Sequence, residues 1–284
     1  MIAIADRISR HPRASAGATS LRAGATLLGA MIALALFAVF WLEDPNTQEL
    51  SEGGLPPFSP GHPLGTDVLG RDLLNWCAHG IVTSLMISVT VTLLSAVVGV
   101  TIGTLSGYVG GWVDAVLMRI VDLQLAVPPI LVFLAAAMVV PRNIVTMVLL
   151  LSSVAWVPFA RLLRTHTLVE RERGYIAAAR LAGARKGNIL ISHLVPAAAT
   201  PIVVFSSLEV GGVMLYEAGL SFLGLGLEPP TASLGYMIAQ GRDQLGSSWW
   251  IATVPGLFIV VLILAANLIG DGLRDRFHVD NGGH

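Results

Sequence analysis

Long apolar segments alternate with shorter polar ones along most of this chain. A helix needs roughly 20 consecutive apolar residues to cross the hydrocarbon core of a bilayer, which is about 30 Å thick. The third and fourth apolar segments are separated only by a few residues around Pro141, so we expect a tight helical hairpin there. The pattern predicts an all-α integral membrane protein with six transmembrane helices. Their expected positions are about 24–42, 81–107, 118–140, 143–160, 197–217 and 249–270.

The amino-acid composition agrees with a membrane protein and excludes other classes. Of the 284 residues, 54% are hydrophobic and only 12% are charged, whereas soluble domains carry about 25% charged residues. The net charge of −1 gives no overall basic field for binding nucleic acid. We therefore expect contact with membrane lipid and none with nucleic acid.

The first apolar segment follows four arginines and so shares some features with a secretory signal peptide. Its run from Ala25 to Leu42 has 18 residues, whereas the apolar region of a signal peptide usually has about 7–15. We therefore expect a first transmembrane helix that is retained in the protein.

The distribution of cationic residues predicts the orientation of the helices. The N-terminal segment, the connection at 108–119, the loop at 161–196 and the C-terminal segment hold 14 of the 17 Lys and Arg residues. Lys and Arg accumulate in cytoplasmic loops, so both termini are expected in the cytoplasm. The predicted organisation is a cytoplasmic tail at 1–23, a first helix at 24–42, an extracytoplasmic loop at 43–80, a core transmembrane domain at 81–272 and a cytoplasmic tail at 273–284.

The polar loop at 161–196 has an internal order that distinguishes it from a merely solvated connection. It carries seven Lys and Arg residues against only two acidic ones, Glu170 and Glu172. A helical run is followed by Gly183 and then by a second short helical run that ends at Pro196. Because glycine commonly ends a helix and proline cannot continue one, this order predicts a folded cytoplasmic segment.

Glycines recur at every fourth position in and after the second apolar segment. Gly99, Gly103, Gly107 and Gly111 form three overlapping motifs of the small-xxx-small type on one helix face. Such motifs let a neighbouring backbone approach closely. The sequence allows two interpretations: packing within this helix bundle, or an interface with another subunit.

Three carboxylates fall within or next to predicted helices. Asp122 precedes Pro128 and Pro129, and a proline pair permits a kink in a membrane helix. Glu209 and Glu217 lie within or at the end of the fifth predicted helix. A carboxylate inside the membrane is a functional candidate because an unpaired charge there is costly. Structural capping or pairing remains an alternative for each of them.

A further polar motif, HPLGTDVLGRDLL at 62–74, lies in the predicted extracytoplasmic loop. Asp67 and Asp72 flank Arg71 closely enough for a local charge-assisted hydrogen bond. The sequence therefore predicts an ordered loop here.

The chain lacks the common motifs of catalytic and nucleotide-binding proteins. Its single lysine, Lys186, follows Arg185 rather than glycine, so the sequence has no GxxxxGK[ST] loop. It has no HExxH or GxSxG motif either. Cys77 is the only cysteine, and the seven histidines include no i, i+4 pair, so no metal site is expected. We expect no enzyme activity and no cofactor on this chain, and active transport would require a separate ATPase.

The loop at 161–196 resembles the ATPase-docking loop of bacterial ABC importer permeases. The core of that pattern is present as Ala178, Ala179, Gly183 and Pro196. The chain departs from the family where Ala177 replaces the usual Glu. The resemblance implies that the short helix after Gly183 lies in a groove of the ATPase. It also implies a structural role for His193. The residues expected to couple to the ATPase are Ala177, Ala178, Ala179, Gly183, Ala184, Arg185, Lys186, His193 and Pro196.

Four other segments resemble the C-type subunit of dipeptide and oligopeptide permeases, in the right order. These segments are the motif at 62–74, GYVGGWVDAVLMRIVD at 107–122, EAGLSFLGLGLEPPTASLGYM at 217–237 and NLIGDGLRD at 267–275. The resemblance implies the type I ABC importer permease fold in a bacterial inner membrane. For the extracytoplasmic motifs we expect a role in gating or in facing a binding protein, with Asp67, Arg71, Asp72 and Glu217 as the candidate residues.

The resemblance further implies a set of partners. These are a second homologous permease subunit, two ATP-binding subunits that hold ATP and Mg, and an extracytoplasmic substrate-binding protein. The expected function is that of a permease subunit that forms half of the path of an ATP-driven importer for di- and oligopeptides.

Two alternatives to this function stay open in the sequence. Similar permeases carry nickel complexes, glutathione or other small solutes. A secondary transporter driven by an ion gradient is the alternative from another class; Asp122 and Glu209 would be its ionisable candidates, although no inverted repeat is evident.

Overall fold

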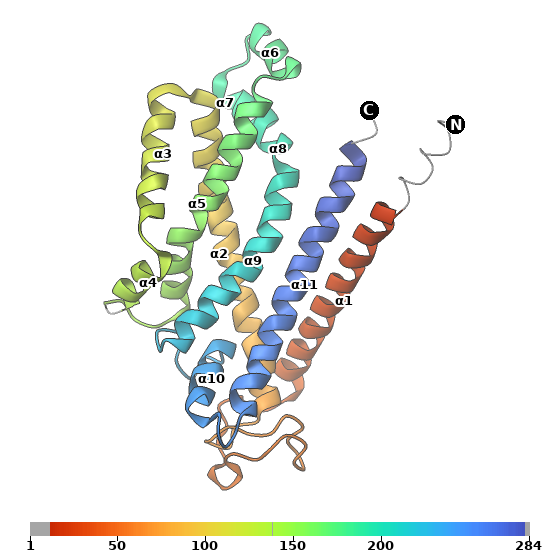
Figure 1. Ribbon diagram of the computed structural model, residues 1–284, viewed down its shortest axis with the longest axis vertical. Coiled ribbons are helices and arrows are strands. Elements are labelled where there is room, and N and C mark those ends of the chain that lie inside the picture. The colour runs from red at the N-terminus through yellow and green to blue at the C-terminus, as the bar shows by residue number, and fades with distance from the viewer. Residues whose placement is uncertain (1–11, 138, 282–284) are drawn as a thin grey trace.

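The computed structural model describes residues 12–137 and 139–281, and within these ranges the chain is built from helices joined by short connections (Figure 1). In the described ranges, β-structure is limited to isolated bridges between loop residues. The α-helices are α1 Pro12–Trp41, α2 Leu73–Val109, α3 Gly111–Ala126, α4 Pro129–Ala137, α5 Ile144–Glu170, α6 Gly174–Leu181, α7 Lys186–Ile189, α8 Val195–Ala197, α9 Ala199–Phe222, α10 Leu234–Gly241 and α11 Trp250–Asn281. Single turns also occur at Leu50–Glu52 and Arg242–Gln244, and a π-helical segment at Leu190–Leu194.

Five of the described helices are long and apolar enough to cross a membrane: α1, α2, α5, α9 and α11. The pair α3 and α4 passes the same test as one broken span, which gives six. The predicted all-α membrane protein with six spans is confirmed in this form.

The third span differs from the single helix expected at 118–140. Helix α3 begins earlier, at Gly111, and the axis of α4 is bent from it by 78°. Val127, between the two helices, has an extended backbone with φ −101° and ψ 123°. Proline disfavours the helical conformation of the residue before it and lacks a backbone donor, so Pro128 and Pro129 account for the break.

Several helices also extend beyond the predicted apolar windows. Helix α2 begins at Leu73 rather than 81, because the Asp72 carboxylate caps it by accepting a hydrogen bond of 2.7 Å from the Asn75 backbone N–H. The segment 73–80 therefore belongs to a helix and not to the loop at 43–80. Helix α5 runs on to Glu170, into the loop expected at 161–196. Hydropathy reports only the membrane core, so it misses the polar turns of a helix outside it.

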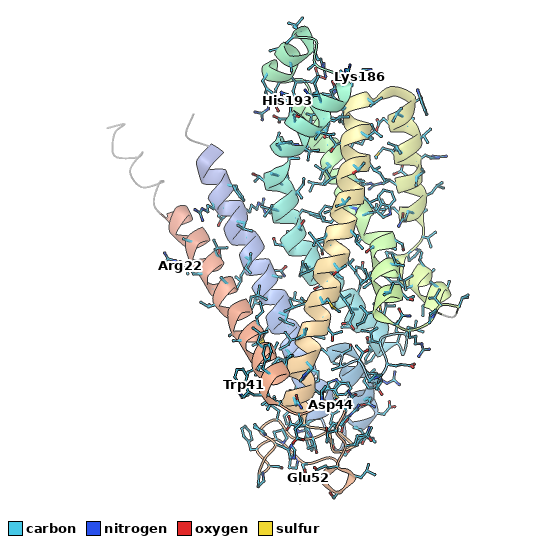
Figure 2. The ribbon with its side chains drawn as sticks, turned by 180° about the vertical axis from the view of Figure 1, so that it is seen from behind. Arg22, Trp41, Asp44, Glu52, Lys186 and His193 are labelled. Atoms are coloured by element: carbon cyan, nitrogen blue, oxygen red, sulfur yellow. The ribbon has the colours of Figure 1, made fainter. Side chains whose placement is uncertain are left out.

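The helices form an elongated bundle with two distinct ends (Figure 1). Helix α2 runs along α5, α1 packs beside α11, and α9 lies against α2, α5 and α11. Helix α6 projects from one end, where the first described residues of α1 and the last of α11 also lie. Helix α10 and the loop after α1 close the other end. We call these the α6 end and the α10 end; Lys186 and His193 lie at the first, and Asp44 and Glu52 at the second (Figure 2).

Three glycines allow α2 and α5 to approach each other closely. A Cβ atom built on Gly99 or Gly103 would overlap the backbone of α5 at Trp156 or Ala160, and one on Gly107 would lie 2.8 Å from the Arg164 carbonyl oxygen. The packing of these residues is thus internal to the bundle. Gly111 does not belong to this face, because α2 ends at Val109 and Gly111 begins α3 with no atom within 4 Å of its built Cβ.

This contact predicts different effects for two Gly→Ala substitutions within helices. Gly103→Ala places a methyl group into the backbone of α5, and overpacking of this kind typically costs about 1–3 kcal/mol. We expect a thermal unfolding temperature several degrees below that of the wild type in detergent. Gly29→Ala in α1, where nothing lies within 4 Å, is the matched control and should leave the temperature unchanged or raise it. Equal unfolding temperatures for the two variants would contradict this account of the contact.

Candidate functional site

The segment after α5 forms a folded projection at the α6 end (Figure 1). Helix α6 ends in a pair of hydrogen bonds: Gly183 N–H donates to the Arg180 carbonyl at 3.0 Å, and Ala184 N–H donates to the Ala179 carbonyl at 3.1 Å. This pairing is the Schellman motif, which requires a left-handed residue just after the helix. Gly183 supplies it with φ +82°. Glycine at this position therefore fixes the direction in which the chain turns back from α6.

A small apolar core holds the projection to the bundle. Ile176 of α6, Ile189 of α7 and Leu194 of the π-helical segment are buried together, with Tyr108 at the end of α2 packed against them. Leu190 and the partly buried Ala179 and Ala184 complete this cluster. The projection and α2 are therefore expected to move as one body.

Polar contacts fix the start of α6. The Tyr175 hydroxyl donates to the Glu170 Oε1 at 2.7 Å, and Arg173 lies 3.0 Å from the Glu170 Oε2. Burial, and then the hydrogen bond to this carboxylate, raise the pKa of Tyr175 to about 12. The ring of His193 stacks on Tyr175 at 6.3 Å between centroids. His193 therefore packs against the start of α6, and the structural role expected for it stays a prediction.

The outer face of α6 is apolar where it is most exposed. Leu181 is 90% exposed at the end of the helix, and Ala177 and Ala178 are exposed beside it, while Ile176 is buried on the opposite face. The resemblance to ABC importer permeases implied that the short helix after Gly183 lies in a groove of the ATPase, and this stays a prediction. Helix α7 has only four residues, and its Ile189 belongs to the buried cluster, so α6 is the outermost part of the loop.

The remaining predicted coupling residues divide between surface and interior. Arg185, Lys186 and Pro196 are exposed, whereas Ala184 is partly buried in the loop core. A cleft of about 480 Å³ separates the end of α2 from the loop, and its cationic lining residues are Arg171, Arg180 and Lys186. The Arg180 guanidinium lies 5.3 Å from the centroid of the Tyr108 ring. This end of the molecule is therefore basic.

Ion pairs anchor α5 to α3 just inside the bundle. The Arg164 guanidinium donates two hydrogen bonds to the Asp114 carboxylate, at 2.6 and 2.7 Å, and the Ser106 hydroxyl of α2 donates to the same carboxylate. Asp122, which the sequence left open, pairs with Arg161 at 2.7 Å. A structural pairing role thus accounts for Asp122.

The α10 end contains a buried ion pair. The Arg71 Nε donates to the Asp67 Oδ2 at 2.6 Å, and Arg71 also donates to the Gln240 Oε1 on α10 at 2.7 Å. Its guanidinium lies 4.2 Å from the centroid of the Trp76 ring. Arg71 and Asp67 are 1% and 0% exposed, so they join the loop to α10 and cannot face a binding protein. Of the two expected roles, their burial leaves gating as the prediction for these residues, because a desolvated pair of this kind is stable only when its hydrogen bonds are satisfied internally.

Asp72 takes part in a second charged cluster nearer the surface. Its Oδ2 lies 2.7 Å from the Nδ1 of His62, whose Nε2 lies 2.8 Å from the Glu52 Oε2. The hydrogen bond to Asp72 and then the bond to Glu52 raise the pKa of His62 above its ordinary value, although partial burial opposes them. The sequence motif contained His62, but Glu52 lies ten residues before it in an irregular segment and so gave no periodic signal.

Glu217 lies in a buried polar cluster between three helices. Its carboxylate accepts hydrogen bonds from Ser233 at 2.8 Å, Ser221 at 3.2 Å and Ser84 at 3.4 Å. Ser233 also caps the start of α10. Glu217 therefore ties α9 to α2 and α10. Sequence reasoning missed the three serines because they come from separate segments and share no spacing.

Comparison with known proteins gives concordant results. The family described as "Binding-protein-dependent transport system inner membrane component" matches residues 99–279. The chain is 41% identical over 226 residues to the oligopeptide transport system permease protein OppC of Mycobacterium tuberculosis, covering 78% of this chain and 77% of that protein. It is 37% identical over 224 residues to the di/tripeptide transport system permease protein DppC of Pseudomonas aeruginosa, covering 79% and 73%. It is 34% identical over 261 residues to the probable D,D-dipeptide transport system permease protein DdpC of Escherichia coli, covering 91% and 87%.

The His62 cluster predicts a pH dependence of stability. Because the folded state raises the pKa of His62, the cluster stabilises the fold fully below the ordinary histidine pKa of about 6.5 and loses this contribution as pH rises through the raised value. Between pH 6 and pH 9 the wild type should lose roughly 1 kcal/mol or less of its free energy of unfolding, or about 2–4 °C in unfolding temperature. We expect His62→Gln to lack this loss. His79→Gln is the control, since the His79 ring bonds to the Asn75 carbonyl and not to a carboxylate. A pH profile of His62→Gln that parallels the wild type would exclude this role.

Proposed function

The chain belongs to the family of inner membrane components of binding-protein-dependent transport systems, and from this premise we propose that it is a permease subunit of an ATP-driven importer of di- and oligopeptides. The substrates in the names of its relatives support the peptide class. The observation that carries the coupling role is α6, a Schellman-capped helix that projects from the bundle with Leu181 on its exposed face. An ion-gradient mechanism is not favoured, because Asp122 is paired and the family is dependent on binding proteins.

The proposed assembly contains a second homologous permease subunit, two ATP-binding subunits that hold ATP and Mg, and a substrate-binding protein on the extracytoplasmic side. The complex resides in the bacterial inner membrane. This chain forms half of the translocation path and carries out no hydrolysis. The α6 end faces the cytoplasm, where its basic residues Arg180, Arg185 and Lys186 favour an ATPase surface that carries carboxylates.

The proposed coupling follows two connections from the docking loop. The buried cluster of Ile176 and Ile189 transmits displacement of α6 to α2 through Tyr108. The π-helical segment and α8 lead directly into α9 at Ala199. At the far end, Glu217 joins α9, α2 and α10, so both connections converge on one polar cluster. Movement of α6 would therefore reach the α10 end through α2 and α9, as a gate at that end would require.

Orientation in the membrane follows from the same proposal. Arg22 lies in the half of α1 nearer the α6 end and Trp41 lies at the α10 end (Figure 2). We expect a reporter fused after Pro60 to be active on the extracytoplasmic side, and one fused after Arg185 to be active in the cytoplasm. Alkaline phosphatase and fluorescent-protein fusions measure the two sides. The opposite result at either position would overturn the assigned orientation.

The docking role of α6 predicts a position-specific effect of charge. We expect Leu181→Asp to weaken assembly of the permease with its ATPase by about tenfold or more, since hydrophobic residues at the centre of an interface contribute roughly 1–3 kcal/mol each. Membrane insertion should be unchanged because the side chain is already 90% exposed. Co-purification of the ATPase and peptide-stimulated ATP hydrolysis provide the measurements.

Leu50→Asp is the matched control for this experiment. Leu50 is 74% exposed at the α10 end and undergoes the same chemical change. It should leave ATPase assembly unaffected. If Leu181→Asp retains full assembly and coupled hydrolysis, α6 is not the ATPase contact.

A further inference from the structure

Glu209 is a carboxylate near the middle of α9, in the span Ala199–Phe222. Its side chain is partly buried. No described residue forms a hydrogen bond or an ion pair with it, in contrast to Glu217 two turns further along the same helix. The coupling described above makes no use of Glu209.

An unpaired carboxylate at this depth restricts what can surround it. Charged side chains within membrane spans face a bundle interior or a water-filled cavity and almost never face lipid, because their desolvation is costly. The described residues supply no cation to Glu209. A charged partner for this carboxylate would therefore lie outside the described residues.

Helix α9 also has a face that this chain leaves uncovered. Gly212 and Gly219 have no atom within 4 Å of a built Cβ, and Leu215 between them is 64% exposed. Glu209 lies at the edge of this face, while Val213, one turn further on, is buried. Gly212 and Gly219 leave space along this face, and Glu209 is the charged residue at its edge.

The position of α9 in the fold indicates what that surface borders. The helix begins directly after the docking loop, and it ends at the Glu217 cluster that holds α10. It therefore joins the element proposed to be driven by the ATPase to the element proposed to act as the gate, as α2 also does through Tyr108 and Ser84. Of these two helices, α9 is the one that carries carboxylates within its span, and such side chains face a bundle interior or a water-filled cavity.

We propose that Glu209 lines the translocation path and binds the ammonium group of the passing substrate. This inference rests on the proposed function as a peptide importer. A peptide with a free N-terminus carries an ammonium group at neutral pH, since its pKa is about 8. A carboxylate and an ammonium form a charge-assisted hydrogen bond, roughly twice as strong as a neutral one. One such contact on an otherwise apolar face would bind a peptide by its N-terminal ammonium group, which such peptides share, independently of their side chains.

Cysteine accessibility tests whether Glu209 borders water. The native Cys77 is fully buried, so the wild-type chain serves as the unlabelled blank. We expect Glu209→Cys in the assembled complex to react with a membrane-impermeant methanethiosulfonate reagent, at a rate that differs between the nucleotide-free and ATP-bound states. Val213→Cys, one turn away and buried, is the control and should stay unlabelled. Lack of reaction of Glu209→Cys in both states would overturn the proposal.

A transport assay tests the ligand. Reconstituted complex is supplied with a dipeptide or with its desamino analogue, each at a concentration that saturates the binding protein. We expect the wild type to transport the dipeptide about tenfold more efficiently, as one charge-assisted hydrogen bond allows. Glu209→Gln should reduce this ratio to about one, and Glu209→Asp should restore part of it.

The outcomes separate this inference from the proposed function. If the wild-type complex transports the dipeptide but Glu209→Gln keeps the wild-type ratio, the ammonium site is wrong and the importer function stands. If the wild-type complex transports no peptide at all, the proposed function itself fails, and the ammonium site fails with it.

Discussion

The close approach of α2 and α5 is the contact on which the rest of the structure depends. Gly99, Gly103 and Gly107 lie at three successive turns of α2, and each faces the backbone of α5. Helices in a membrane gain little from hydrophobic association, so van der Waals contact between closely spaced backbones must replace it. Where the glycines end, the Asp114–Arg164 pair continues the attachment by fixing α3 to α5. The loop after α5 is therefore attached to three helices, α2, α3 and α5, that are held tightly to one another.

The two ends of the bundle differ in how their charged residues are paired. At the α10 end, two buried charged side chains are satisfied within the chain: Arg71 is held by Asp67 and Gln240, and Glu217 by three serines. At the α6 end, Arg185 and Lys186 are exposed and Leu181 projects beyond the bundle. A fully satisfied polar network rigidifies the structure around it, whereas exposed charges beside an exposed apolar residue are typical of an interaction surface. The division agrees with a subunit that is driven from one end and gated at the other.

Sequence reasoning succeeded where one residue type has one conformational consequence. Hydropathy located the spans, and Gly183 and the proline pair marked a helix end and a helix break because glycine and proline restrict the backbone directly. The type I importer permease fold and the family, expected from motifs in order, are confirmed by the family match. The burial of Asp67 and Arg71 could not be predicted, because it depends on Gln240, which lies 169 residues after Arg71 in the sequence. The packing of the loop after α5 could not be predicted for a similar reason: the burial of Ile189 against Tyr108 is a tertiary contact that no local pattern encodes.

Charged groups without a partner in this chain mark where it depends on other molecules. A buried polar group is stable only with partners, so every internal pair in the bundle marks a place where the fold is complete. Glu209 differs from these pairs, since it lies partly buried in a span and has no partner among the described residues. Its environment must be completed by water, by substrate or by another subunit, and the uncovered glycine face beside it leaves room for this. The same reasoning applies to the cleft beneath the docking loop, where Arg171, Arg180 and Lys186 converge without an equal number of carboxylates. Glu209 and this cleft therefore lie at the two places where the proposed function requires contact with something outside the chain.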